Sequence, residues 1–337
     1  MRGESRGGAL FFGMVLAAIM STAPAAAKSK ITVFDPKGSV STYALAINAE
    51  GDVTGYYRDS AGDYHGYIRV ANGTITTFDV SSATNTNPRG INDQGTISGF
   101  YKDSSGKQHG FVRTSNGTIT TFDASNAMNT QGVSVDDKGT VVGYYEDSGG
   151  AWHGFTRTSA GKIKPFSVSG AASTYAIGIN SKSTTAGYWS DTAGVIHGFT
   201  SSSKGKITSF DVSGAAFTAG ESINAKGAIT GFYEDADDAL HGFVRDASGT
   251  ITSFDPKGST IETMAEHISD KGTIVGYYTD PSKNQDLAFL RSASGKITTF
   301  GVSKAAGTFA LSINSKGVIA GYYEDDSSHL HGFVRGK

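Results

Sequence analysis

The run "ITTFD" at Ile75–Asp79 decides the fold, because versions of it return along the whole chain. The starts of these runs are roughly 44 residues apart, a period typical of repeat architectures. The versions begin at residues 31 (ITVFD), 75 and 119 (ITTFD), 163 (IKPFS), 207 and 251 (ITSFD) and 297 (ITTFG). The chain is therefore expected to consist of repeated copies of one structural unit.

One complete unit is "ITTFDASNAMNTQGVSVDDKGTVVGYYEDSGGAWHGFTRTSAGK", Ile119–Lys162. It contains four short β-rich runs, each bounded by Gly, Asn, Asp or Ser, which are turn residues. Four antiparallel strands in about 44 residues is the size of one β-propeller blade. The sequence thus predicts an all-β fold, a seven-bladed β-propeller of four-stranded antiparallel blades.

The two ends of the repeat region predict how the ring closes. The region opens with an "ITTFD"-type strand, Ile31 to Asp35, and stops after a third strand, His331 to Arg335. If the "ITTFD" strand is the outermost of its blade, the first strand completes the last blade. This arrangement would remove unpaired strand edges, which otherwise promote aggregation.

Composition and the first residues predict an exported protein. The chain has 337 residues with 45 Gly, 6 Pro and no Cys, so it contains no disulfide and no Cys-based metal site. A basic start, the apolar stretch from Ala9 to Met20 and the Ala25 to Ala27 triplet resemble a signal peptide. We expect residues 1–27 to be a signal peptide and residues 28–337 a single propeller domain, located in the periplasm or secreted.

The unit "GINDQGTISGFYKDSSGKQHGF", Gly90 to Phe111, resembles the HAF repeats of bacterial exported proteins. The family takes its name from a His-Ala-Phe that in this chain is mostly His-Gly-Phe. The resemblance covers all seven repeats, and it implies an extracytoplasmic repeat protein. It implies no particular activity.

An aspartate follows the paired aromatics of each unit, and a histidine stands six positions later in six of the seven units. These pairs are Asp59 and His65, Asp103 and His109, Asp147 and His153, Asp191 and His197, Asp235 and His241, and Asp325 and His331. A catalytic group is needed once per active site, whereas a feature that every blade carries is more typical of the blade itself. We interpret the pairs as a structural blade motif that holds the hairpin between the second and third strands, and we predict no catalytic residue among them.

Alternate loops of an antiparallel meander fall on opposite faces, and this divides the charges. The face with the loops after "ITTFD" and after "GYYxD" is acidic, and the other face is basic. Acidic residues are densest at Asp235, Asp237, Asp238, Asp325 and Asp326. This cluster is a candidate Ca²⁺ site, with a solvated rim as the alternative. No other cofactor is expected.

Departures from the repeat are where an individual site is sought. The fourth repeat has Trp189 where its sisters have Tyr, and the third has Trp152 before its histidine. The sixth carries Glu266 and His267 within its inner strand, where they would line the central channel. These four residues are the candidate ligand-binding residues, and drift of a redundant repeat is the competing interpretation.

The regular, short loops favour a non-enzymatic binding or scaffold module, with a glycan or a protein of the cell envelope or exterior as partner. Near-identical copies around a ring suit multivalent binding. A propeller-type polysaccharide lyase or glycosidase with a site at the channel mouth is the alternative. Because the basic face lacks a groove with stacking aromatics, no nucleic-acid partner is expected; we also expect no membrane span and a monomer.

Overall fold

The computed structural model describes residues 29–337, so the predicted signal peptide lies outside the described residues. The described part folds into 28 strands and contains no helix. Within it, accordingly, no helix is long and apolar enough to cross a membrane. The all-β prediction is confirmed.

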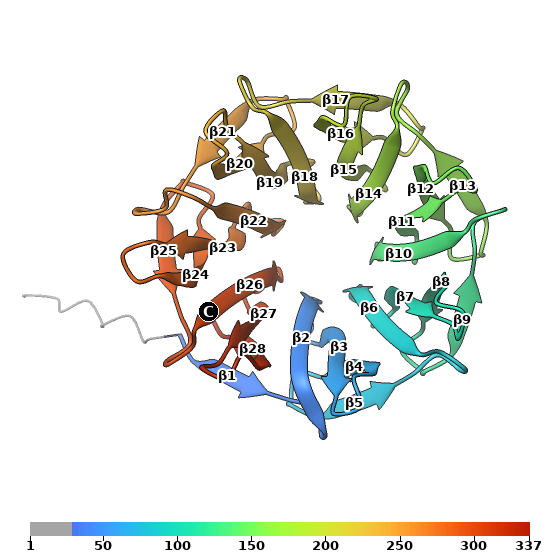
Figure 1. Ribbon diagram of the computed structural model, residues 1–337, viewed down its shortest axis with the longest axis horizontal. Coiled ribbons are helices and arrows are strands. Elements are labelled where there is room, and N and C mark those ends of the chain that lie inside the picture. The colour runs from blue at the N-terminus through green and yellow to red at the C-terminus, as the bar shows by residue number, and fades with distance from the viewer. Residues whose placement is uncertain (1–28) are drawn as a thin grey trace, which may run out of the picture.

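Consecutive strands pair antiparallel in groups of four, from the centre of the molecule outward (Figure 1). The innermost strands are β2 (Ser39–Ile47), β6 (Asn85–Ile91), β10 (Asn129–Val135), β14 (Ser173–Ile179), β18 (Phe217–Ile223), β22 (Thr263–Ile268) and β26 (Gly307–Ile313). The second strands are β3 (Val53–Asp59), β7 (Ile97–Lys102), β11 (Val141–Glu146), β15 (Thr185–Ser190), β19 (Ile229–Glu234), β23 (Ile274–Asp280) and β27 (Ile319–Glu324).

The third strands are β4 (Tyr64–Arg69), β8 (Gln108–Arg113), β12 (Trp152–Arg157), β16 (Ile196–Ser201), β20 (Leu240–Arg245), β24 (Gln285–Arg291) and β28 (Leu330–Arg335). The outermost strands are β1 (Ile31–Phe34), β5 (Ile75–Phe78), β9 (Ile119–Phe122), β13 (Ile163–Phe166), β17 (Ile207–Phe210), β21 (Ile251–Phe254) and β25 (Ile297–Phe300). The 28 strands suggest seven blades, and a blade is named below by its innermost strand.

The first and last strands of the described chain pair with each other. β1 runs antiparallel to β28, with Ile31 opposite Arg335 and Phe34 opposite Gly332. β1 therefore occupies in the β26 blade the position that β5 occupies in the β2 blade (Figure 1). The outermost strand of each other blade follows its own third strand directly in the chain.

The core lies between neighbouring blades and is built on phenylalanine. Phe111 of β8 is fully buried, and its ring meets the edge of Phe78 in the preceding blade at a centroid distance of 6.2 Å. The guanidinium of Arg113 stacks over the same Phe78 ring, 4.8 Å from its centroid. This cation–π stack adds to the packing, and it recurs at six of the blade contacts.

The β14 blade departs from this stacking, because Ser201 stands where the other third strands have Arg. Phe166 still meets Phe199 edge to face at 6.0 Å, without an arginine above it. A Cβ placed at Gly205 would lie 3.7 Å from Nζ of Lys164, whereas the equivalent Gly161 faces the Arg157 guanidinium at 3.5 Å. In the β14 blade, the Lys164 ammonium thus lies close to the position that an arginine guanidinium occupies in the other blades.

The glycine of each "HGF" run is required by the outermost strand. A Cβ at Gly154 would lie 2.7 Å from the ring of Phe166, and one at Gly110 would lie 2.4 Å from the ring of Phe122. A Cβ at these distances would force the ring to move, so glycine lets the aromatic ring cover the third strand closely. The β22 blade is the exception, with Ala288 opposite Phe300.

An asparagine at the end of the inner strands ties each blade to the next. Oδ1 of Asn48 accepts hydrogen bonds from the backbone N–H groups of Gly51 and Asp52, which forms an Asx-type turn. Its Nδ2 donates to the carbonyl of Asn92 in the next blade. The same inter-blade bond joins Asn92 to Asp136, Asn180 to Asn224, Asn224 to Ser269 and Asn314 to Asn48.

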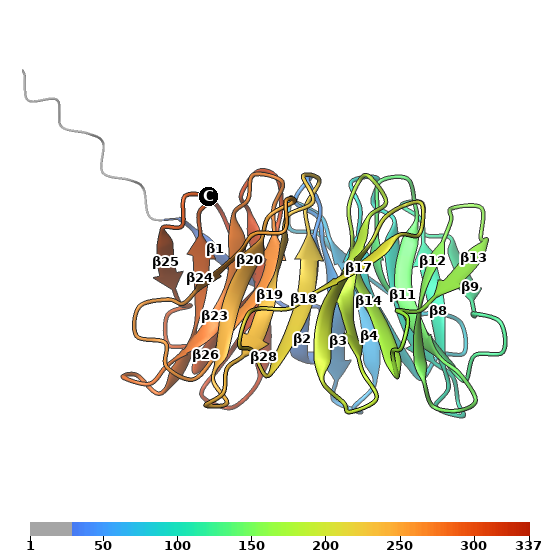
Figure 2. The same ribbon diagram turned by 90° about the horizontal axis from the view of Figure 1, so that it is seen from above.

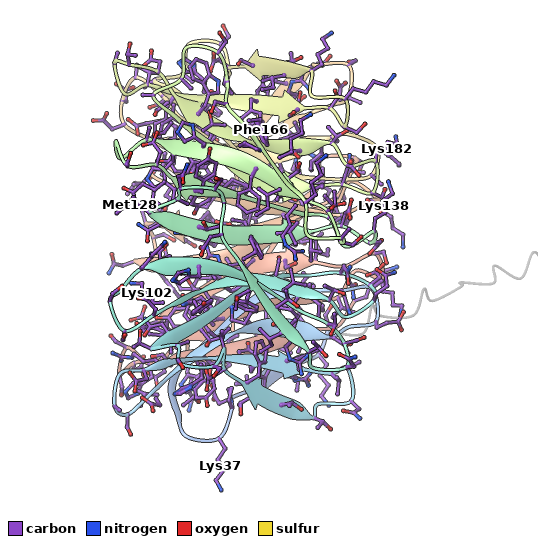
Figure 3. All side chains as sticks on the ribbon, turned by 90° about the vertical axis from the view of Figure 1, so that its right-hand side faces the viewer. Lys37, Lys102, Met128, Lys138, Phe166 and Lys182 are labelled. Carbon is purple, nitrogen blue, oxygen red and sulfur yellow. The ribbon has the colours of Figure 1, made fainter. Side chains whose placement is uncertain are left out.

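The loops lie on two opposite faces of a disc (Figure 2). Lys138 and Lys182, in the turns between the first and second strands, lie on one face (Figure 3). Lys102 and Met128 lie on the opposite face, with the loops that join the second strand to the third. The predicted acidic and basic faces depend on this separation of the loops onto two faces.

Candidate functional site in the central channel

Every innermost strand contains a β-bulge at the same place. The pairing of first with second strand skips one residue, for example between Ala44 and Ala46 in β2 and between Pro88 and Gly90 in β6. The skipped residues are Leu45, Arg89, Val133, Ile177, Glu221, Glu266 and Leu311. A bulge redirects a side chain out of the sheet, and all seven residues line a central cavity of about 340 Å³. We call them the bulge ring.

The residue type in the bulge ring varies from blade to blade, unlike most positions of the repeat. Four of its members are apolar, and three, Arg89, Glu221 and Glu266, are charged. Glu221 in β18 and Glu266 in β22 belong to neighbouring blades, and β6, which carries Arg89, lies across the channel from both (Figure 1). The ring therefore has a cationic side and an acidic side separated by apolar walls.

The two carboxylates have unusual electrostatics. Burial raises the pKa of Glu221, and the nearby Glu266 raises it further, while Arg89 works in the opposite direction. Burial likewise raises the pKa of Glu266, where Arg89 opposes the shift and Glu262 adds to it. Within residues 29–337 neither carboxylate accepts a hydrogen bond, and no ion pair within 4.0 Å joins either to Arg89. Both carboxyl groups are half-buried, line the channel and lack a protein partner.

Tyrosines of the second strands lie within electrostatic range of the two channel glutamates. Burial raises the pKa of Tyr277, with Glu266 and Glu262 adding to the effect. The pKa of Tyr188 is raised by burial and by Glu221, and that of Tyr322 by burial and by Glu266. These phenols stay protonated near neutral pH and are hydrogen-bond donors beside the ring.

His267 lies next to the bulge ring and lines the same cavity, as its position in the sequence predicted. Its Nδ1 accepts a hydrogen bond of 3.5 Å from the backbone N–H of Ile313 in the next blade. Burial lowers the pKa of His267 to about 4, against an opposing effect of Asp270. His267 is neutral near pH 7, and its observed contact links two blades.

The structure separates the other two candidate ligand residues from Glu266 and His267. Trp152 packs edge to face on Tyr144 at 5.3 Å and lies 6.2 Å from Tyr175, between the β10 and β14 blades. Trp189 stacks on His197 at 4.5 Å, inside its own blade. The four residues therefore do not form one site; only Glu266 and His267 share the channel.

The repeated histidines each join two loops of a blade. In the β6 blade, one ring nitrogen of His109 contacts Asp103 at 3.2 Å and the other contacts Asp123, just after the outermost strand, at 2.8 Å. Oδ1 of Asp103 accepts backbone hydrogen bonds from Ser105 and Lys107 in the hairpin. In the β10 blade, Ser167 takes the place of the second carboxylate, 2.9 Å from His153.

We call this arrangement of a histidine between two loops the histidine bridge. Its acidic partners after the outermost strands were not predicted from the sequence. The first partner of His197, Asp191, lies farther away, at 3.8 Å. Although burial works to lower it, hydrogen bonds to Asp79 and Asp59 raise the pKa of His65. Both ring nitrogens are engaged, as a structural role requires, and the structural interpretation itself stays a prediction.

The acidic residues proposed for Ca²⁺ are partly engaged in their own turns. Oδ1 of Asp235 accepts hydrogen bonds from the backbone of Asp237 and Ala239, and Oδ2 contacts His241 at 3.0 Å. Asp325 accepts from Ser327 and His329 in the same way. In the part of the chain that the structure describes, no three His, Asp or Glu side chains are arranged to hold a metal ion. The calcium prediction gains no support from this geometry.

Glu266 was a candidate from the sequence, whereas Arg89 and Glu221 were not. The signal was present at the third position before the turn asparagine, where aligned repeats have Leu45, Val133, Ile177 and Leu311. A charge at that position was visible, but the bulge that directs the side chain into the channel was not.

No family model matches the chain, and no curated protein matches it in sequence. Solved structures do match its fold. A catalytically inactive variant of virginiamycin B lyase from Staphylococcus aureus, with quinupristin, is 14% identical with a TM-score of 0.59, covering 91% of this chain and 99% of that one. The β-propeller domain of the Trilobed protease from Pyrococcus furiosus is 9% identical with a TM-score of 0.63, covering 88% and 95%.

The BP39L lectin from Burkholderia pseudomallei is 11% identical with a TM-score of 0.58, covering 88% of this chain and 96% of that one. The chain has the β-propeller fold. At these identities the likeness shows the fold alone, and an enzyme and a lectin share it.

Proposed function

We propose that the chain is an exported, non-enzymatic binding or scaffold module, a seven-bladed ring closed by β1. Its partner would be a glycan or a protein of the cell envelope or exterior. The HAF-type repeats and the signal-like segment support export, and the pairing of β1 with β28 supports the closed ring.

The observation that carries the binding function is the use of the repeated Asp and His within the blade. Both nitrogens of His109 are occupied by Asp103 and Asp123. The repeated surface therefore offers a rigid shape rather than free catalytic groups. Short loops held by side chains are suited to binding with little loss of conformational freedom.

Binding of residues 28–337 to a glycan array and to envelope fractions tests this proposal. We expect binding without turnover, and several ligand molecules per chain in titration calorimetry if the repeated blades form the sites. Absence of binding to every glycan and envelope fraction would contradict it, as would release of a cleaved product.

A matched pair of variants locates the surface. Trp152→Gln introduces the residue that the preceding repeat has at Gln108, and Trp189→Tyr introduces the residue of the sister blades. If Trp152 contacts the ligand, the first variant weakens binding and the second does not. Equal loss in both variants would mean that packing, and not contact, is responsible.

A second candidate function rests on Glu221 and Glu266. Two carboxyl groups with raised pKa facing one cavity are the groups that a glycosidase or lyase uses as acid and base. Incubation with envelope polysaccharides tests this alternative: product formation by the unchanged protein, abolished by Glu266→Gln, would replace the binding proposal.

A further inference from the structure

The charges of the bulge ring are not needed by the fold. Leu45, Val133, Ile177 and Leu311 occupy the same bulge position in four other inner strands. A partly buried charge without a protein partner loses some of its hydration and gains nothing in return. Glu221 and Glu266 are half-buried, Arg89 is exposed, and all three line the same cavity at positions where the fold accepts leucine, valine or isoleucine. Three charges that the fold does not need, gathered on one cavity, therefore point to a ligand that pairs with them.

The arrangement of the charges determines what kind of ligand this is. Glu221 and Glu266 lie in the neighbouring strands β18 and β22, and Arg89 lies across the channel in β6 (Figure 1). A simple cation would satisfy the carboxylates and leave the guanidinium unpaired. A simple anion would do the reverse. Only a molecule with a positive and a negative end satisfies all three groups.

The cavity between the charges limits the size of the ligand and determines the chemical character of its central part. Its volume of about 340 Å³ lies at the lower end of the range for small-molecule sites. Leu45, Val133, Ile177 and Leu311 complete its wall with apolar surface. This wall suits a short hydrocarbon segment between the two charged ends.

We propose that the channel binds a small zwitterion, with its ammonium group between Glu221 and Glu266 and its carboxylate paired with Arg89. Amino acids and dipeptides with separated charges belong to this chemical class. Burial and the neighbouring carboxyl groups raise the pKa of Glu221 and Glu266, and an ammonium ion bound between them would lower both pKa values and favour the charged carboxylates. The site is independent of the partner that the faces bind, so either proposal can fail alone.

A series of straight-chain ω-amino carboxylates of increasing length measures the separation between the cationic and the acidic side of the channel. Calorimetric titration of the mature protein should show tightest binding at one length, with one molecule per chain. The alkylamine and the alkyl carboxylate of that length each lack one charge, and each should bind about tenfold more weakly or worse. Equal affinity for the amine and the amino carboxylate would overturn the role of Arg89.

Variants that introduce the bulge residue of another blade test which residue binds each charged end of the ligand. Arg89→Leu should bind the amine and the amino carboxylate equally, and Glu221→Ile with Glu266→Leu should bind neither. Lys182→Ala, on the basic face, is the control and should bind like the unchanged protein. Because the new residues already occupy the bulge in other blades, the variants are expected to fold, and a thermal melt checks this.

If any variant melts early, Glu221→Gln and Arg89→Gln repeat the test with nearly unchanged volume. Retained discrimination in Arg89→Leu overturns the proposal. So does the absence of binding by the unchanged protein to every member of the series at millimolar concentration, which would mean that water alone satisfies the ring.

Discussion

The histidine bridges and the bulge ring each recur at one fixed position in successive blades. They differ in how well the sequence is repeated and in whether the polar atoms are paired. The bridges have nearly the same residues in six blades, and their polar atoms are paired within the blade. The bulge ring has Leu, Arg, Val, Ile or Glu at one position, and its charges lack protein partners. Repetition with satisfied bonds marks the residues that build the blade; departure with unsatisfied charge marks the residues that are free to bind.

The largest effect is expected from removing the closing strand. Deletion of residues 30–35 removes β1 and with it Asp35, which lies 2.8 Å from His331. β28 then has an exposed edge, and edge strands pair with other chains. Size-exclusion chromatography should show dimers or aggregates. A monomer with an unchanged melting temperature would show that the bridge and the strand at the closure are dispensable.

The histidine bridges should make stability depend on pH. Hydrogen bonds to the Asp63 and Ala61 backbone and to His65 outweigh burial and lower the pKa of Asp59, while Asp79 and Asp59 outweigh burial and raise that of His65. The carboxylate contribution is present above the ordinary Asp pKa of 3.8 and is lost as pH falls through the lower folded-state value. The imidazole contribution is complete below 6.5 and is lost as pH rises through the higher folded-state value.

The free energy of unfolding in urea should therefore be greatest between those two pH values. A variant with glutamine in place of His65, His241 and His331 should show a smaller decline on the alkaline side, because glutamine does not titrate; the part that remains comes from Glu221 and Glu266, whose pKa values are also raised. An unchanged alkaline decline in that variant would mean that other groups are responsible.

A single bridge should matter less than all of them together. His109→Ala removes contacts to two carboxylates and should lower the free energy of unfolding by about 2 kcal/mol. His153→Ala removes one carboxylate and one hydroxyl contact and should cost less. Both should leave binding per folded molecule unchanged. A loss of binding at constant stability would overturn the structural interpretation.

The smallest effect is expected in the opposite direction, at the bulge ring. Glu221→Ile replaces a half-buried carboxyl group without a protein partner by the residue that β14 carries at Ile177. We expect it to stabilise the protein by roughly 1 kcal/mol while weakening binding in the channel. A destabilised variant would show that Glu221 has a structural partner.

The sequence predicted the repeat, the strand order and the pairing of β1 with β28, because each depends on local patterns that recur many times. It also predicted that Glu266 and His267 lie in the channel wall. It did not predict the carboxylates Asp79 and Asp123 as partners of histidines, since these contacts join the ends of separate strands. Nor did it predict the bulges, which arise from the pairing register and have no residue signature in these strands.

The strand β1 also sets the order in which the molecule can be completed. Asp35, which follows β1, and His331 of β28 meet although they are 296 residues apart in the chain. Contacts of such separation form slowly, because the intervening chain must first be ordered. Blades whose strands are all consecutive can form while the β26 blade still lacks its outermost strand. Refolding should therefore end in a slow phase that the first and last strands share, and a mixing experiment with a synthetic β1 peptide would reveal it by competition.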